Sequence, residues 1–201
     1  MLKGSMTLRE LLGLGQQAAP LKDSALIMID CQNTYRQGIM QLTGVEEALL
    51  EARKLLGMAR DLKIPIFHIR HDAGEGTPYD VRAEIGAISK EVAPLPTEPV
   101  ITKNFPDSFF QTDLDQRLKA LGIHHIVLAG FMTHMCVNST AKGGFERGYA
   151  PSVVASATAS RPLLADRGRV ISAQEVHEAA LASTRDLYAA IVDGADDFRS
   201  I

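Results

Sequence analysis

The sequence predicts a single α/β domain in which a doubly wound parallel sheet of six strands is covered by helices on both faces. Two observations support this prediction. Short apolar runs alternate along the chain with segments of helical periodicity, a pattern typical of parallel strands joined by crossover helices. The length of 201 residues is enough for one such domain and too short for two ordinary domains.

Six apolar runs that are rich in β-forming residues are predicted as the strands. They lie near residues 25–30, 65–70, 99–102, 125–130, 151–155 and 190–193, and the last one is short. Apolar runs of this length are expected where helices cover both faces of a sheet.

The first two predicted helices follow the first and the third strand. Thr43 and Glu46 have the spacing of a capping box, and the apolar positions after them recur at helical intervals. The second helix starts at Thr112 and stops at Gly122, because glycine is favoured just beyond a helix end.

Two further helices are predicted in the carboxyl-terminal half of the chain. One begins inside 133–137 and ends before Gly148. The other has the clearest start signal, the capping box of Ser172 and Glu175, and its end is placed near residue 189.

One domain is predicted over residues 24–201, behind an amino-terminal extension of residues 1–23 that carries a short helix. Residues 1–5 are interpreted as a cloning remnant in front of a natural start at Met6. No linker rich in Pro, Gly or Ser divides the rest of the chain.

Charge and hydropathy exclude several classes of partner. The formal net charge is −3 and no Lys/Arg-rich run occurs, which argues against nucleic acid and anionic membrane surfaces. The apolar runs have the length of strands, so no transmembrane span is predicted. The only two cysteines, Cys31 and Cys136, offer no disulfide framework, and a cytoplasmic location is expected.

Three residues with complementary chemistry are predicted at one edge of the sheet. In doubly wound sheets, ligands bind beyond the carboxyl ends of the strands. Asp30 and Lys103 follow the first and third strands, and Cys136 lies where the fourth strand turns into a helix. A helix amino terminus lowers a thiol's pKa, so Cys136 is the predicted nucleophile.

Three motifs surround these residues. They read Leu26-Ile-Met-Ile-Asp30-Cys-Gln32, Ile101-Thr-Lys103 with the following Ser108-Phe109, and Gly130-Phe-Met-Thr133-His-Met-Cys136-Val137. In order and spacing they resemble the isochorismatase-like cysteine hydrolases, which include nicotinamidases, carbamoyl-amide hydrolases and isochorismatases. The resemblance covers residues 24–193 and implies a Rossmann-like sheet of order 3-2-1-4-5-6.

The resemblance also implies a catalytic triad of Asp30, Lys103 and Cys136. In the resembled family, the oxyanion hole is built from backbone N–H groups of the nucleophile and of the residue four before it, here Cys136 and Met132. A cis peptide between Phe131 and Met132 is implied as well.

The same three side chains suit the hydrolysis of an amide. Its carbonyl is a poor electrophile, so cleavage needs a strong nucleophile, a proton donor for the leaving nitrogen and donors for the oxyanion. In this scheme Cys136 attacks, Asp30 moves the proton and later activates water against the thioester, and Lys103 holds Asp30 and favours the thiolate. We expect a cysteine hydrolase, independent of metal, that cleaves a carbonyl C–N bond of a small carboxamide or ureido compound.

Two alternatives stay open. One is enol-ether hydrolysis of the isochorismatase type, whose enzymes do not depend on a cysteine at this position. The other is a non-catalytic binding or assembly protein on the same fold. The loops carry no transferable code for the identity of a substrate.

The loops 31–43, 70–90 and 104–111 are expected to wall the site, and two of them are long enough to form a lid. The predicted pocket residues share a place in these loops or in the motifs, and they are Gln32, Tyr35, Phe109, Phe131 and His134. The sequence leaves open whether His134 contacts the substrate or a neighbouring subunit.

No metal and no organic cofactor is expected. His68, His71 and Asp72 lie near the end of the second strand, but they lack the Asp-x-His pattern of relatives that hold a divalent ion. The expected partners are a small-molecule substrate and further copies of the chain. A homodimer or homotetramer is predicted, with His134 or the loop 104–111 at the contact.

Overall fold

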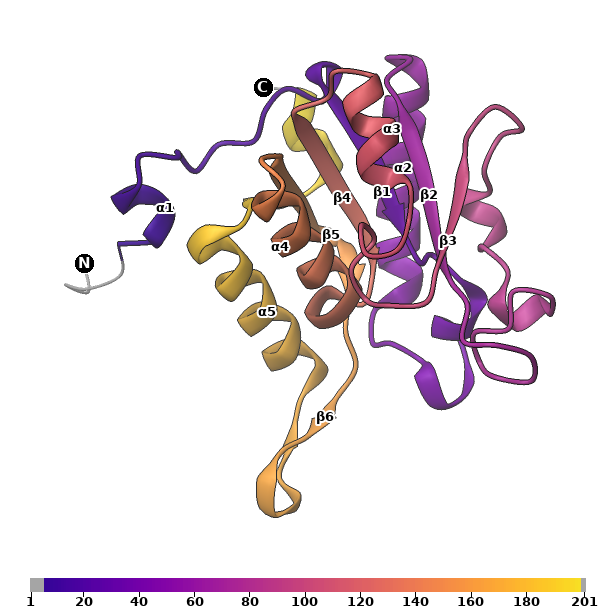
Figure 1. Ribbon diagram of the computed structural model, residues 1–201. Helices are drawn as coiled ribbons and strands as arrows, with labels where there is room; N and C mark the ends of the chain where they lie inside the picture. Colours follow the sequence, from indigo (N-terminus) through magenta and orange to yellow (C-terminus); the bar gives the residue numbers. More distant parts are fainter. Residues whose placement is uncertain (1–5, 200–201) are drawn as a thin grey trace.

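The computed structural model describes residues 6–199, and every strand of its six-stranded sheet is parallel to its neighbours (Figure 1). The strand order is β3-β2-β1-β4-β5-β8, so the predicted fold and the order 3-2-1-4-5-6 are confirmed. The strands are β1 (Ser24–Ile29), β2 (Ile66–His71), β3 (Val100–Lys103), β4 (His125–Phe131), β5 (Ala150–Ala159) and β8 (Ala190–Val192). Residues 1–5, interpreted above as a cloning remnant, lie outside the described residues.

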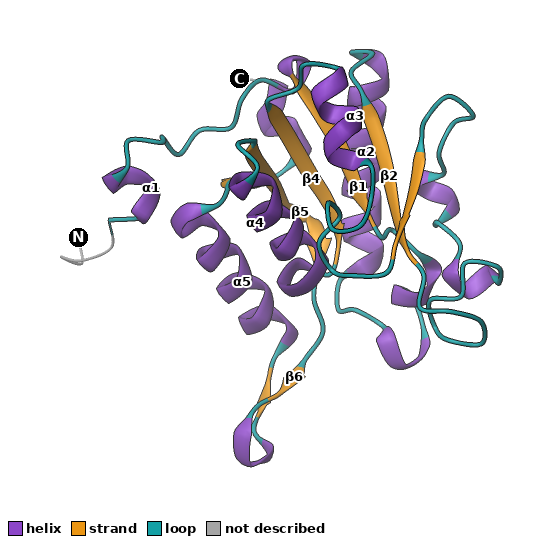
Figure 2. Cartoon of the chain, viewed as in Figure 1, coloured by secondary structure: helices purple, strands orange, loops and turns teal. Residues whose placement is uncertain are grey.

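Helices cover both faces of this sheet (Figure 2). The α-helices described are α1 (Leu8–Leu11), α2 (Val45–Asp61), α3 (Leu114–Ala120), α4 (Asn138–Glu146) and α5 (Ala173–Leu187). An unpredicted antiparallel hairpin of β6 (Leu163–Leu164) and β7 (Val170–Ile171) forms a separate small sheet. Among residues 6–199, no helix combines the length and the apolar character that a membrane crossing requires.

Several short helical turns complete the chain between these elements. The 3₁₀ turns are Leu21–Asp23, Asn33–Tyr35, Gly38–Met40, Glu84–Gly86, Lys90–Val92, Asp166–Gly168 and Ala195–Arg199. A π-helical turn, Thr133–Val137, joins β4 to α4. The third predicted helix is thus confirmed, with a π-helical first turn.

Alternate residues of β1 serve two cores on opposite sides of the sheet. Ile27 and Ile29 pack in a cluster with residues of α3 and α4, whereas Leu26 packs with residues of α2. Cys31 belongs to the cluster on the α2 side, and Cys136 belongs to the other. Cys31 thus packs on the face of the sheet opposite to Cys136.

Of the two capping boxes that the sequence predicts, one forms. The hydroxyl of Ser172 accepts the N–H of Glu175 at 3.2 Å, and the carboxylate of Glu175 accepts the N–H of Ser172 at 2.8 Å. The predicted box of Thr43 and Glu46 is wrong. Gly44, with φ 73°, precedes the first turn of α2, and the Thr43 backbone pairs in a β-bridge instead.

Replacing Gly130 with Ala is expected to destabilise the fold by more than about 3 kcal/mol. Gly130 lies in β4 with φ 121°, and a Cβ there would meet the carbonyl oxygen of Ile29 at 1.9 Å. The β1 backbone cannot retreat without breaking its ladder with β4. The free energy of unfolding in denaturant measures the change.

Gly57→Ala in α2 is the matched control for that substitution. A Cβ at Gly57 would meet nothing within 4 Å. In a helix interior, this change is expected to raise the free energy of unfolding by about 0.5–1 kcal/mol. Similar stabilities of the Gly130 and Gly57 variants would contradict the assigned close approach of β4 to β1.

Candidate active site

The three predicted catalytic side chains lie together at the carboxyl edge of the sheet. Asp30 follows β1, Lys103 ends β3, and Cys136 lies in the π-helical turn after β4. The Lys103 Nζ is 2.6 Å from Oδ2 of Asp30, and both side chains are 0% exposed. Cys136 is also buried, close enough that Asp30 and Lys103 both act on its thiol electrostatically. The topology of the sheet thus brings the carboxylate, the ammonium and the thiol together.

The backbone of Asp30 is held in an unusual conformation. Its φ of 48° lies in the left-handed region, which is strained for a residue other than glycine. The Asp30 N–H donates to the carbonyl of Ile69 at 3.0 Å, and the Asp30 carbonyl accepts the N–H of Gln32 at 2.7 Å. These two bonds maintain the sharp turn that follows β1.

The resting thiol is protonated, and the predicted lowering of its pKa is wrong. Burial, followed by the negative charge of Asp30, raises the pKa of Cys136 to about 12, although Lys103 acts in the opposite direction. Burial alone would lower the pKa of Lys103, but the negative charge of Asp30 outweighs it, and this pKa is raised. The site therefore rests as a thiol beside an ion pair.

The carboxylate of Asp30 is the group in the site that can accept the proton of that thiol. Among residues 6–199, the Lys103 ammonium pairs with its Oδ2 at 2.6 Å, and no group donates a well-aligned hydrogen bond to either of its oxygens. Its remaining lone pairs are unoccupied by the protein, which suits a group that must take up and release a proton.

The π-helical turn that presents the nucleophile is anchored at its first residue and closed by its own backbone bonds. It follows a cis peptide between Phe131 and Met132, as the resemblance implies. The Met132 carbonyl accepts two backbone N–H groups of the turn, at 3.0 and 3.2 Å. The hydroxyl of the turn's first residue lies 2.9 Å from Nδ1 of His177 on α5. The oxyanion hole formed by the N–H groups of Met132 and Cys136 stays a prediction.

A wall of packed rings lies beside the ion pair. Nδ1 of His71 lies 3.4 Å from the Lys103 ammonium, and burial, together with the Lys103 charge, lowers the pKa of His71. The ring is therefore neutral and accepts from Lys103. Tyr79 packs edge-on against His71 at 5.2 Å, and Tyr35 packs against Tyr79 at 5.8 Å and Phe131 at 5.6 Å. Neither His71, which was weighed above only as a metal ligand, nor Tyr79 is among the predicted pocket residues.

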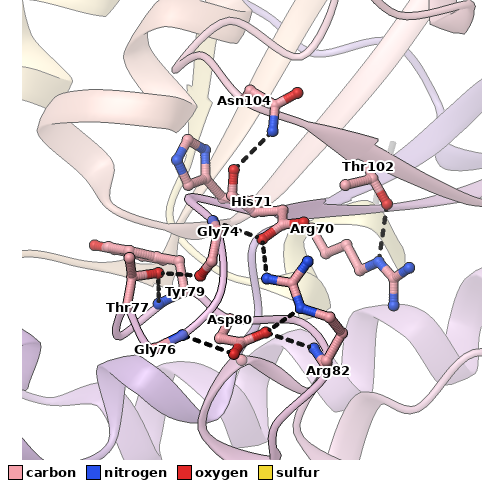
Figure 3. Close-up of polar contacts among 12 residues, drawn as sticks. Arg70, His71, Gly74, Gly76, Thr77, Tyr79, Asp80, Arg82, Thr102 and Asn104 are labelled. Carbon is pink, nitrogen blue, oxygen red and sulfur yellow. Dashed lines mark hydrogen bonds and ion pairs between the residues drawn. The ribbon is translucent and has the colours of Figure 1, made fainter.

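The loop after β2 holds Tyr79 in this wall, as Figure 3 shows. The carboxylate of Asp80 accepts the N–H of Gly76 at 2.9 Å and two groups of Arg82, at 2.7 and 3.0 Å. A bond from the Thr77 hydroxyl to a loop carbonyl, at 2.8 Å, closes the turn. The loop after β2, which was predicted to wall the site, thus contains a turn that is held by its own hydrogen bonds.

Gln32 braces the site, and its amide is not available to a substrate in the way predicted. Its Nε2 donates to the carbonyls of His71 and Gly86, at 3.0 and 2.8 Å, and its Oε1 accepts the His71 N–H at 2.8 Å. Gln32 is 0% exposed. It therefore ties the end of β1 to the end of β2 and to the loop that follows.

Phe109 and His134 lie on the face of the sheet that carries the nucleophile. Phe109 stacks on Tyr149 at 5.5 Å, in the core cluster that contains Cys136. His134 is half-buried, its Nδ1 lies 3.1 Å from the Ser160 hydroxyl, and it lines a groove between the π-helical turn and α5. No contact of His134 with the ion pair is described, so its role toward substrate stays a prediction.

Arg161 is a side chain at the same edge of the sheet that is not among the predicted site residues. β5 continues to Ala159 instead of ending at residue 155, so Arg161 lies just past the carboxyl end of a strand. Its Nε is buried without a hydrogen-bond partner among residues 6–199, and its Nη1 makes only a 3.4 Å bond to the Pro162 carbonyl. Its charge acts on Tyr79 and His134.

The histidine that lies deepest in β2 belongs to a different network. His68 is 3.0 Å from Glu98, to which Arg60 also donates two bonds at 2.8 Å. Arg60 and Glu98 line a cavity of about 660 Å³ at the amino ends of β2 and β3, away from the triad. Across residues 6–199, no group of three His, Cys, Asp or Glu side chains could hold a metal ion.

The chain is similar in sequence and structure to proteins of one family. The family model described as the isochorismatase domain matches residues 24–196. An uncharacterized isochorismatase family protein of Bacillus subtilis, YddQ, is 36% identical over 171 residues, 84% of this chain and 94% of that protein. The ureidoacrylate amidohydrolase RutB of Stutzerimonas stutzeri is 28% identical over 177 residues, 70% of this chain and 71% of that protein. The crystal structure of an isochorismatase from Pseudomonas putida matches with a TM-score of 0.92 at 32% identity, covering 96% of this chain and 99% of that one.

Proposed function

Because the chain belongs to the isochorismatase family, we propose that it is a cysteine hydrolase that cleaves a carbonyl C–N bond of a small carboxamide or ureido compound. One observation carries this proposal. A thiol, a carboxylate and an ammonium are buried in contact with one another. Burying such charges is costly, so a site of this kind indicates chemistry more than stability. The amidohydrolase relative supports the choice of bond.

In the first half of the proposed reaction, the sulfur of Cys136 attacks the carbonyl carbon while Asp30 takes the thiol proton. The new S–C bond converts the carbonyl to an oxyanion, and its collapse breaks the C–N bond. Asp30 then passes its proton to the leaving nitrogen. Lys103 stabilises the negative charge of the sulfur as it forms, which offsets the high pKa of the resting thiol.

In the second half, water attacks the thioester and Asp30 takes its proton. The S–C bond breaks, the acid product leaves, and the proton returns to the sulfur of Cys136. With a ureido substrate, the acyl group on sulfur is a thiocarbamate, and the steps are otherwise the same. The neutral His71 would keep the ammonium of Lys103 aligned through both halves.

The preferred substrate in this proposal also carries an anionic group, which Arg161 binds. The buried Nε of Arg161 has no partner among residues 6–199, and a guanidinium matches a carboxylate with two parallel bonds. Arg161 follows the carboxyl end of β5, the strand beside β4, so an anion bound to it would lie at the same edge of the sheet as the triad. The name of the ureidoacrylate amidohydrolase likewise describes a substrate with a carboxylate.

Ammonia release from a matched pair of amides tests the proposal. Succinamic acid presents one amide and one carboxylate, and succinamide replaces the carboxylate with a second amide. Arg161→Gln is expected to raise KM for the acid at least about tenfold, equivalent to roughly 1.4 kcal/mol, and to change KM for the diamide little. The exposed Arg53→Gln on α2 is the control and should change neither.

Other outcomes separate the alternatives. Release of ammonia from neutral amides alone would keep the hydrolase and reject the anionic subsite. Cleavage of an enol ether without ammonia release from any amide or ureide would favour the isochorismatase reaction. Binding of these compounds without turnover would favour a non-catalytic protein.

The proposed enzyme needs no cofactor and works in the cytoplasm as a homo-oligomer.

A further inference from the structure

The cavity of about 660 Å³ lies at the edge of the sheet opposite the triad. Residues at the amino ends of β2 and β3 line it, together with residues at the carboxyl-terminal ends of α2 and α3. A volume of this size is typical of sites that enclose a small molecule. The reaction proposed above uses none of the side chains that line this cavity, so its presence has no explanation there.

The wall of the cavity is largely aliphatic. Ile64, Ile66 and Phe67 line it and are buried in the protein. Leu95 and Leu121 also line it, and they are 47% and 56% exposed. Leucines that remain this exposed beside a hollow offer apolar surface for a ligand to cover. The wall therefore favours a ligand with a hydrocarbon body.

Among the described residues that line the cavity, Glu98 alone is acidic, and its carboxylate is already paired. It accepts two bonds from Arg60 and one from the Leu95 N–H, each at 2.8 Å, and it lies 3.0 Å from Nε2 of His68. Burial would raise the pKa of Glu98, but these bonds outweigh it and lower the pKa to about 2. Four donors fill the acceptor sites of a carboxylate, so Glu98 has no free acceptor for a cationic ligand.

Positive charge in the cavity is left without a full complement. Lys63 has neither an ion pair nor a side-chain hydrogen bond among residues 6–199. Arg117 binds Asp113 through Nε and Nη2, and its Nη1 makes no bond within the same described range. Lys63 and Arg117 are thus the side chains of the lining that can still bind an anion.

The ends of the two helices do not cancel this positive charge. Carbonyl groups at a helix carboxyl terminus carry partial negative charge and would repel an anion if they were free. At both helices, carbonyls of the last turn accept capping N–H groups. The donors are Leu62, Lys63 and Ile64 after α2, and Leu121, Gly122 and Ile123 after α3.

We propose that this cavity binds a small organic anion with an aliphatic body, of the fatty-carboxylate class, at a second site separate from the triad. The carboxylate of the ligand pairs with Lys63 and with Nη1 of Arg117. The hydrocarbon body covers the apolar wall that includes Leu95 and Leu121. A neutral ligand of the same shape would leave both cations without a partner. The proposal stands on this cavity and does not depend on the reaction proposed above.

Octanoate and 1-octanol are a matched pair of probes, because they share a chain and differ in charge. Calorimetric titration of the full chain at neutral pH should give one saturable site for octanoate and at least about tenfold weaker binding of octanol. Lys63→Gln combined with Arg117→Gln should weaken octanoate binding at least about tenfold and change octanol binding little. Lys119→Gln is the control on α3, because Lys119 pairs with Asp115 and does not line the cavity.

Two further variants locate the bound octanoate. Ala120→Trp fills the cavity from its exposed edge on α3 and should abolish binding of both probes, with circular dichroism as the check of folding. Arg161→Gln lies at the opposite edge of the sheet and should leave octanoate binding unchanged. Equal affinity for the two probes, no saturable binding, or binding that is lost in the Arg161 variant and kept in the Lys63 and Arg117 variant would overturn the proposal.

Discussion

Replacing Cys136 with Ala is expected to lower kcat for amide hydrolysis by at least about 10⁴-fold, equivalent to some 5.5 kcal/mol of barrier. The substitution removes the attacking sulfur and leaves the Asp30–Lys103 ion pair in place. That pair alone can polarise water but cannot form the thioester that divides the reaction into two easier steps. Steady-state ammonia release measures the loss.

Cys31→Ala is the matched control, because Cys31 is the other cysteine and is also buried. Its side chain packs with residues of α2 on the far side of the sheet, so kcat should stay within about threefold of the starting protein. A Cys136→Ala variant that retains turnover within tenfold would assign the nucleophile to another group. Loss of activity in both variants would indicate a general packing defect.

The position of the triad could be predicted because it depends on topology. Asp30, Lys103 and Cys136 each follow an apolar run, and parallel strands bring their carboxyl ends to one edge. Recognising strands and their direction was therefore sufficient to place three residues that are up to 106 positions apart in the sequence, from Asp30 to Cys136. No side-chain detail was needed.

The protonation state of Cys136 could not be predicted in the same way. The helix-start argument considers only the local dipole, which favours the thiolate. Burial and the charge of Asp30 act in the opposite direction and prevail, raising the pKa of Cys136 to about 12. The depth of burial and the contact with Asp30 are properties of the assembled fold.

Arg161 and His71 were missed for two different reasons. The second half of β5 is Ala-Ser-Ala-Thr-Ala, in which only Thr158 favours strands, so its continuation toward Arg161 depends on pairing with β4. His71 carries no motif of its own, and its role comes from its register opposite Lys103 on β3. Both side chains are placed by strand pairing, which cannot be read from the sequence alone.

Replacing Asp30 with Asn is expected to have the second largest effect on activity, lowering kcat by about 10³-fold or more. Asn keeps the shape of the side chain and cannot take the thiol proton. The same change removes the negative charge that raises the pKa of Cys136, while Lys103 remains beside the sulfur. The pKa of Cys136 should therefore fall, so that iodoacetamide labels Cys136 faster at neutral pH in a variant that no longer turns over.

Lys103→Met is the matched comparison, because it removes the charge that acts in the opposite direction on the same sulfur. Its removal should raise the pKa of Cys136 and slow the labelling of that residue at every pH below the pKa. Mapping of the labelled peptides separates Cys136 from Cys31. If both variants labelled faster, a loosened site would explain the result, and the assignment of Asp30 as proton acceptor would fail. Opposite changes in labelling, with turnover lost in the Asp30 variant, are the result that the buried ion pair predicts.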